Sequence, residues 1–136
     1  MAERPRLLIV DDEPSIAKVV RKQLEVAGFE VAVAKDGVEA LASVQAHHPD
    51  LILLDVMLPK INGHEVCKAL RADPQTRAIP IIMLSANARL QDEQHGLEQG
   101  ASAYLTKPFQ LDVLLRHIHQ LLGPRQSMAD SSRPPV

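Results

Sequence analysis

The sequence lacks the features that identify several classes of protein. Its single cysteine, Cys67, cannot form an internal disulfide, and it falls in an apolar helical pattern that favours a buried, unreactive thiol. No apolar run approaches the roughly 18–20 residues that a membrane span needs, and residues 1–6 hold no apolar stretch of signal-peptide length. A net charge of −2 gives no attraction to nucleic acid or to an anionic membrane. We therefore expect a cytoplasmic protein that, as this chain alone, binds neither.

The composition is that of one ordinary globular domain. Apolar residues make up 46% and charged residues 24% of the 136 positions, which fits a chain able to bury a single hydrophobic core. Residues 124–136 differ from the rest, because they are rich in Ser, Pro and Arg and lack apolar periodicity. We predict one folded domain over residues 1–123, followed by a flexible tail or linker. Such a tail fits a stand-alone protein and a fragment of a longer one equally well.

Short apolar runs alternate with amphipathic stretches five times along the chain. The runs predict strands at residues 6–10, 30–34, 50–54, 80–84 and 103–105. The amphipathic stretches predict helices at residues 14–27, 37–47, 63–72, 88–99 and 111–122, and the last is expected to stop at Gly123-Pro124. This alternation gives parallel βαβ units with right-handed crossovers. The predicted fold class is therefore α/β, with a doubly wound, five-stranded parallel sheet and five helices.

Polar side chains follow four of the predicted strands. Asp11 and Asp12 come after the first strand, Asp55 after the third, Ser85 after the fourth and Lys107 after the fifth. In open parallel sheets, ligands bind beside the carboxyl ends of the strands. If the first and third strands are neighbours about 4.8 Å apart, Asp12 and Asp55 lie close together. Lys107 can then reach them along its flexible stem.

Three carboxylates in one pocket require a cation. At about 5 Å and an effective dielectric near 20, each pair repels by roughly 3 kcal/mol. Lys107 supplies one positive charge, and Mg2+, which prefers carboxylate, carbonyl and water ligands, suits the remainder. Asp55 could then attack phosphorus and form an acyl phosphate, while the cations neutralise the phosphoryl oxygens.

Four motifs, in order, resemble the receiver domains of bacterial two-component response regulators, including the chemotaxis regulators. They cover about residues 5–122 and are Leu-Ile-Val-Asp11-Asp12-Glu, Leu-Leu-Asp55-Val-Met-Leu-Pro59 with Asn62-Gly63, Met-Leu-Ser85-Ala86, and Tyr104-Leu-Thr-Lys107-Pro108-Phe. The resemblance implies a flavodoxin-like sheet with strand order 2-1-3-4-5. It also implies a signalling switch, not an enzyme that turns over an external substrate.

The resemblance assigns a role to each residue at the predicted strand ends. Asp55 would accept a phosphoryl group from a sensor histidine kinase or a phosphotransfer protein, and Lys107 would pair with the phosphate. Mg2+ would be bound by Asp55, by Asp12 and by the backbone carbonyl of Met57, with Asp11 acting mainly through a metal-bound water.

The resemblance also implies a switch made of Ser85 and Tyr104. Ser85 would move inward to hydrogen-bond a phosphoryl oxygen, and Tyr104 would rotate from a solvent-facing position into the space that is vacated. This movement would change the surface formed by the predicted helix 88–99, strand 103–105 and helix 111–122, to which a partner binds.

The sequence departs from those family members that bind DNA as dimers through charged residues on the last three elements. Ser102 and Ala103 stand where an acidic pair is usual, and Val113 and His117 replace an acidic and a basic residue. These departures weaken the inference of that dimer, and nothing in these 136 residues codes for a DNA-binding domain.

Three other functions fit the sequence less well. Phosphatases of the haloacid-dehalogenase type also form an aspartyl phosphate, but they carry Asp-x-Asp after the first strand, where this chain has Asp11-Asp12-Glu13. A flavodoxin-like cofactor binder needs a Gly, Ser or Thr loop there to cradle phosphate, which carboxylates would repel. A receiver that has lost phosphorylation would lack motif residues that are all present here.

Overall fold

The computed structural model describes residues 4–85, 100–107 and 109–130. Within these ranges the strands are β1 (Arg6–Val10), β2 (Glu30–Ala34), β3 (Leu51–Asp55), β4 (Ile81–Ser85) and β5 (Ala103–Thr106). The helices are α1 (Pro14–Val26), α2 (Gly37–His47), α3 (Gly63–Ala72) and α5 (Leu111–Asp130). The helix predicted at residues 88–99 lies outside the described residues.

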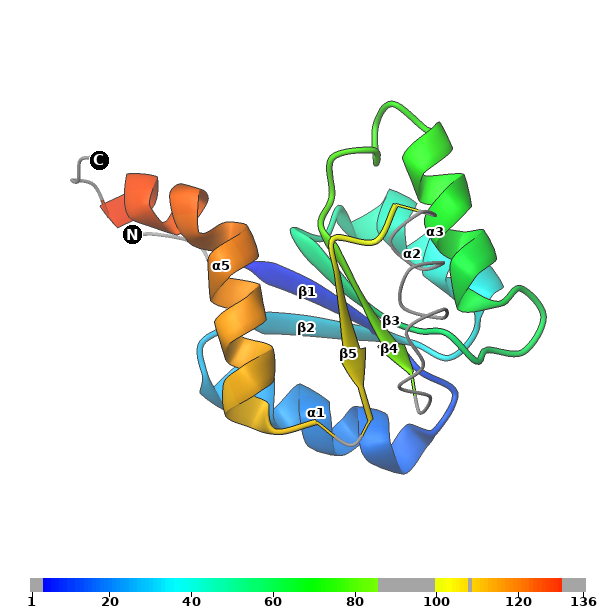
Figure 1. The fold of residues 1–136 in the computed structure, drawn as a ribbon, viewed down its shortest axis with the longest axis horizontal. Coiled ribbons are helices and arrows are strands. Elements are labelled where there is room, and N and C mark those ends of the chain that lie inside the picture. The colour runs from blue at the N-terminus through cyan, green and yellow to red at the C-terminus, as the bar shows by residue number, and fades with distance from the viewer. Residues whose placement is uncertain (1–3, 86–99, 108, 131–136) are drawn as a thin grey trace.

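The five strands form one parallel sheet in the order β2-β1-β3-β4-β5, as predicted. Helices α1 and α5 cover one face, and α2 and α3 cover the other (Figure 1). Because β1 lies between β2 and β3, the chain passes from β1 to β2 on one side, and then crosses back to β3 on the other side of β1. The carboxyl ends of β1 and β3 are therefore the place where strand order reverses, which is where ligands bind in such sheets.

The sheet is covered on both faces, and β3 at its centre is buried along its whole length. Alternate residues of β3 enter different cores: Leu53 packs towards α1 and α5, and Leu54 towards α2 and α3. Cys67 of α3 is fully buried in the second core. The predicted burial of this cysteine is thus confirmed, and burial raises the pKa of its thiol.

Two strands begin and end one residue later than predicted. Asp50 and Pro80 precede β3 and β4, and Asp55 and Ser85 are the last residues of these strands. The backbone N–H of Val56 still donates to the Leu84 carbonyl at 2.9 Å, so the hydrogen-bond ladder continues to this edge. The backbone of Asp55 and of Ser85 is thereby held within the sheet.

Helix α5 does not stop at Gly123-Pro124, as was predicted, but continues to Asp130. A glycine ends a helix when its φ is positive, and among the described glycines only Gly28 and Gly100 have positive φ. Pro124 removes one helical hydrogen bond, which weakens a helix without necessarily ending it. The last turns therefore project beyond the sheet (Figure 1).

None of the described helices has both the length and the apolar character needed to cross a bilayer.

Candidate functional site

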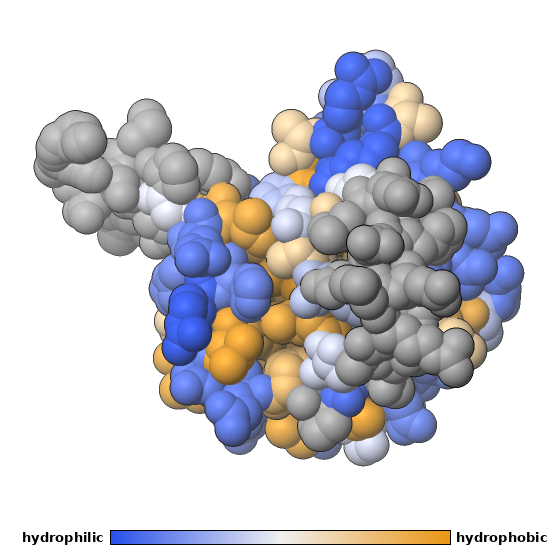
Figure 2. Space-filling view, in the orientation of Figure 1, coloured by the Kyte–Doolittle hydropathy of each residue, from blue (hydrophilic) through white to orange (hydrophobic). Residues whose placement is uncertain are grey.

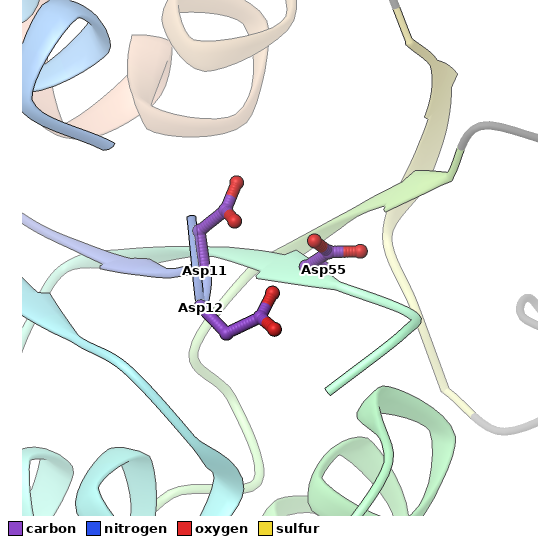
Figure 3. Close-up of side chains that lie close together, drawn as sticks. All are labelled: Asp11, Asp12 and Asp55. Carbon is purple, nitrogen blue, oxygen red and sulfur yellow. The ribbon is translucent and has the colours of Figure 1, made fainter. Parts of the chain in front are cut away.

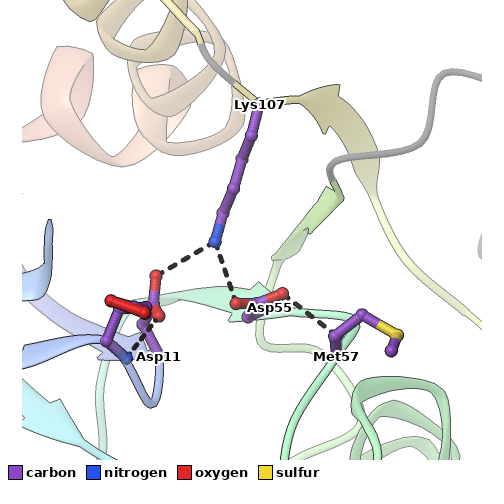
Figure 4. Close-up of polar contacts among 5 residues, drawn as sticks. Asp11, Asp55, Met57 and Lys107 are labelled. Carbon is purple, nitrogen blue, oxygen red and sulfur yellow. Dashed lines mark hydrogen bonds and ion pairs between the residues drawn. The ribbon is translucent and has the colours of Figure 1, made fainter.

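Three charged side chains meet at the carboxyl edge of the sheet. Lys107 Nζ lies 2.9 Å from Asp55 Oδ2 and 3.2 Å from Asp11 Oδ2 (Figure 4). Side chains alternate along a strand, and these three share the face of Ile9, Leu53 and Leu105, which belongs to the core beneath α1 and α5. Sheet register therefore directs the lysine at both carboxylates.

Asp12 completes an acidic cluster from the other side. One carboxylate oxygen from each of Asp11, Asp12 and Asp55 lies within 4.8 Å of the others (Figure 3). Asp11 and Asp55 are buried, whereas Asp12 is exposed. Three carboxylate donors from two neighbouring strand ends, one of them open to solvent, suit a hard divalent cation such as Mg2+ that keeps several waters.

Backbone groups hold the two buried carboxylates in place. Asp55 Oδ1 accepts a hydrogen bond of 3.0 Å from the N–H of Met57, and Asp11 Oδ1 accepts one of 2.9 Å from the N–H of Glu13 (Figure 4). The backbone N–H of Lys107 donates to the Ser85 carbonyl at 2.6 Å, which extends the β4–β5 ladder to the lysine. Met57 is 73% exposed, and its contact with Asp55 is made by its backbone N–H.

The charges in the cluster perturb one another. Burial raises the pKa of Asp55, and Lys107 opposes this only in part. Burial alone would lower the pKa of Lys107, but the hydrogen bonds and charges of Asp55 and Asp11 outweigh it and raise that pKa. Lys107 is therefore cationic at neutral pH, and ionised Asp55 remains an unfavourably desolvated carboxylate that a further cation would stabilise.

Gly63, at the start of α3, approaches the end of β3 more closely than any other residue type could. A Cβ atom there would lie 2.3 Å from the Asp55 carbonyl oxygen and 2.8 Å from Val56 Cα. Asn62 starts the helix with a capping box: its side chain accepts a hydrogen bond from the N–H of Glu65, and the Glu65 side chain accepts one from the N–H of Asn62. The Asn62-Gly63 pair thus packs α3 directly against the proposed acceptor strand.

Ser85 and Tyr104 lie on the same face of neighbouring strands. Tyr104 is in register with Met83 and Ser85 with Thr106, so the two side chains are offset by two residues on the side of α2 and α3. Ser85 is 4% exposed. The expectation of a solvent-facing Tyr104 is wrong for this structure, because its ring packs against the second core and its hydroxyl oxygen is buried. This hydroxyl has no hydrogen-bond partner in the part of the chain that is described.

Comparison with protein families gives a match over residues 7–119 to the response regulator receiver domain. A DNA-binding dual master transcriptional regulator, RpaA of Synechocystis, is 46% identical over 118 residues, which are 87% of this chain and 49% of that protein. The alkaline phosphatase synthesis transcriptional regulatory protein PhoP of Bacillus subtilis is 44% identical over 127 residues, which are 93% and 52% of the two chains. The chain thus spans about half the length of the curated relatives that it matches.

Solved structures show the same fold. A response regulator from Chloroflexus aurantiacus has a TM-score of 0.85 and 38% identity, covering 89% of this chain and 99% of that one. The chemotaxis response regulator CheY4 of Vibrio cholerae has a TM-score of 0.83 and 39% identity, covering 88% and 99%. The receiver domain of a Pseudomonas aeruginosa sensor histidine kinase, with a magnesium ion coordinated in its active site cleft, has a TM-score of 0.82 and 33% identity, covering 88% and 98%.

Proposed function

Because the chain belongs to the response regulator receiver domain family, we propose that it is a phosphorylation-dependent switch of a two-component system in which Asp55 accepts the phosphoryl group. The observation that carries this proposal is the position of Asp55, which ends the central strand with Lys107 on one side and Asp11 and Asp12 on the other. The phosphatase and flavodoxin-like alternatives find no support in these comparisons. Receiver domains are signalling switches, and this one would transfer a phosphoryl group only to itself.

The proposed transfer is an in-line displacement. A carboxylate oxygen of Asp55 attacks the phosphorus of a phosphohistidine on a sensor kinase or phosphotransfer protein. A P–O bond forms as the P–N bond breaks, and the electron pair of the P–N bond remains on the imidazole nitrogen. Both Asp55 oxygens are engaged here, Oδ1 by the Met57 N–H and Oδ2 by Lys107. Lys107 would therefore shift from the carboxylate to the incoming phosphoryl group.

The cluster fits Mg2+, and the similar Pseudomonas receiver binds this ion in its active site cleft. In this chain Asp12, Asp55 and the Met57 carbonyl would hold the ion directly. Asp11, whose Oδ2 is paired with Lys107, would act through water. When bound, Mg2+ supplies the positive charge that neutralises the phosphoryl oxygens.

A groove beside the cluster suits the donor protein. It has a volume of about 510 Å³, lies between α1 and the start of α5, and includes Asp11 and Lys107 in its lining. Two apolar side chains on α1, Ile16 and Val19, line it and are 42% and 58% exposed. An apolar helix that carries the phosphohistidine could pack here and still reach Asp55. We place this encounter in the cytoplasm.

Phosphorylation would be transmitted through Ser85 and Tyr104. A phosphoryl group on Asp55 offers charged acceptor oxygens to the Ser85 hydroxyl at the end of the adjacent strand. Tyr104 lies with Ser85 on the α2/α3 side of the sheet, and β5 is an edge strand, so a change in the packing of Tyr104 would alter the surface around β5. Figure 2 shows hydrophobic surface gathered beside α5, where an output partner could bind.

The acceptor is tested with acetyl phosphate and Mg2+. We expect stoichiometric labelling of the wild-type chain and none of Asp55→Asn, which preserves the size of the side chain. Asp50→Asn, at the opposite end of β3, is the matched control and should be labelled like the wild type. Undiminished labelling of Asp55→Asn would refute the assignment.

A further inference from the structure

The short connection from β2 to α2, residues Ala34–Gly37, contacts both halves of the proposed metal site. We propose that Asp36 and Gly37 are positioning residues that fix the β3–α3 loop, and with it the Met57 carbonyl, for Mg2+ binding. This inference rests on the proposed function, because it assigns the residues that keep its metal site assembled. Neither residue is among the metal ligands.

The β3–α3 loop, residues 56–62, is held at its two ends by the sheet and by α3. The N–H of Val56 donates to the Leu84 carbonyl, and the N–H of Gly63 donates to the Val56 carbonyl, both at 2.9 Å. Met57 is tied to Asp55 through its N–H. Between these anchors the loop carries Lys60, whose φ of 69° lies in the left-handed region that non-glycine residues rarely adopt. Contacts from outside the loop must therefore stabilise this part of it.

Gly37, the first residue of α2, supplies one such contact. A Cβ atom on Gly37 would lie 2.6 Å from the Ile61 carbonyl oxygen, 2.8 Å from Ile61 Cβ and 3.0 Å from Val66 Cγ2. The first of these atoms is backbone, so a larger residue could be accommodated only by moving the loop. Gly37 thus allows the β3–α3 loop to pack directly against the first turn of α2.

Asp36 supplies the second contact. Its Oδ1 accepts the N–H of Glu39 at 2.8 Å and caps α2, and its Oδ2 lies 3.4 Å from Lys60 Nζ. The Asp36 side chain is 5% exposed and the Lys60 side chain 63% exposed. A buried carboxylate, fixed by the helix that it caps, therefore attracts the lysine at the strained position of the loop.

The same connection also touches the β1 side of the site. The N–H of Asp11 donates to the carbonyl of Ala34, the last residue of β2, at 3.0 Å. Only two residues separate Ala34, which binds the backbone of Asp11, from Gly37, which contacts the loop that bears Met57. Asp11 and Met57 both belong to the proposed metal site. Three carboxylates repel one another before a cation arrives. A connection that contacts both sides opposes their separation and keeps the site assembled.

The test is a Mg2+ titration followed by the amide NMR signals of residues 55–57, since the chain has no tryptophan to report binding by fluorescence. We expect Gly37→Ala to raise the Mg2+ Kd about tenfold, the lower range for residues that orient metal ligands. Asp36→Asn keeps an N-cap side chain but removes the charge that faces Lys60. It should raise the Kd only about threefold, because an ion pair with an exposed lysine contributes little. Lys60→Met should do the same, and the double variant should be no weaker than either single variant.

Two controls are matched to these changes. In Gly123→Ala the added Cβ meets no atom within 4 Å, so a helical glycine is replaced without a clash. Glu30→Gln removes the 3.7 Å ion pair with Arg6 at the opposite end of the sheet. Both controls should bind Mg2+ like the wild type.

The outcomes separate this inference from the proposed function. If the wild-type chain binds no Mg2+, both are wrong. If the wild type binds Mg2+ and Asp55 is labelled, but the Asp36, Gly37 and Lys60 variants keep the wild-type Kd, only the positioning role is refuted. Lower thermal stability with unchanged Kd counts as the same refutation. Should Gly37→Ala not fold, Asp36→Asn and Lys60→Met decide the matter by their double-mutant cycle.

Discussion

Lys107 Nζ lies 2.9 Å from Asp55 Oδ2, although the two residues are 52 positions apart in the sequence. The same nitrogen lies 3.2 Å from Asp11 Oδ2, so one cation serves two buried carboxylates. In the absence of metal, this lysine offsets the repulsion between the two buried carboxylates.

Lys107→Met keeps most of the stem but removes the charge. We expect the free energy of unfolding without metal to fall by about 2 kcal/mol, less than for a fully buried pair because the lysine side chain is 20% exposed. Saturating Mg2+ should restore part of this loss, since it binds the folded state. Urea denaturation with and without Mg2+ measures both effects. Lys18→Met, on the exposed face of α1, is the control, and equal stability of the two variants would contradict the role given to Lys107.

Asp55 makes the stability of the metal-free protein depend on pH. Burial raises its folded-state pKa above the unfolded value of about 3.9. The folded protein therefore binds this proton more tightly, and the associated stability is fully present below pH about 4 and is lost as pH rises through the folded pKa. Relative to Asp55→Asn, the wild type should thus become less stable with rising pH in this window. A difference between the two that does not change with pH would contradict the shift.

We predict that the groove beside α1 binds the kinase and takes no part in the phosphoryl transfer itself. Ile16→Lys and Val19→Lys place a charge on its apolar rim, and each should slow transfer from a phosphorylated histidine kinase at least tenfold. Labelling by acetyl phosphate should be unchanged, because neither residue belongs to the acidic cluster at Asp55. Val26→Lys, at the end of α1 where the valine is 81% exposed, is the control. Equal losses with both phosphodonors would show that the groove is not a docking surface.

Tyr104→Phe is predicted to stabilise the unphosphorylated protein. The hydroxyl is buried without a hydrogen-bond partner among the described residues, so its removal relieves a desolvation cost. We expect a gain of about 1 kcal/mol in the free energy of unfolding, measured by urea denaturation. A loss of similar size would mean that the hydroxyl is hydrogen-bonded in solution.

His48 ends α2 in the left-handed conformation, with φ of 50°. His48→Gly should raise the free energy of unfolding by about 0.5–1 kcal/mol, because glycine adopts this conformation without a steric cost. His47→Gly, one residue earlier and still helical, should lower it by about 1 kcal/mol. Opposite signs of the change in the free energy of unfolding at these adjacent histidines would show that the backbone conformation, and not the loss of an imidazole, causes the effect.

The sequence alone predicted every described strand, and the helices α1, α2 and α3, to within one residue. Apolar periodicity is local, and in this chain it agrees with the packing: the run Leu51–Leu54 is apolar throughout because helices cover both faces of β3. The positions of Asp11, Asp55, Ser85 and Lys107 after apolar runs were enough to place them at one edge of a parallel sheet. The end of α5 was predicted wrongly, because a Gly-Pro pair weakens a helix but the backbone of Gly123 kept helical geometry.

Only the tertiary structure decided how these residues meet. Strand order and register direct Lys107 towards Asp11 as well as Asp55, and leave Asp12 on the exposed side of the cluster. The roles proposed for Asp36 and Gly37 depend on a contact with Ile61 and an ion pair with Lys60, both more than twenty residues away along the chain. The sequence pattern records which face of its own element a residue occupies. It does not record that a Cβ atom on Gly37 would lie 2.6 Å from the Ile61 carbonyl oxygen, because that distance is set by the packing of elements that are remote in sequence.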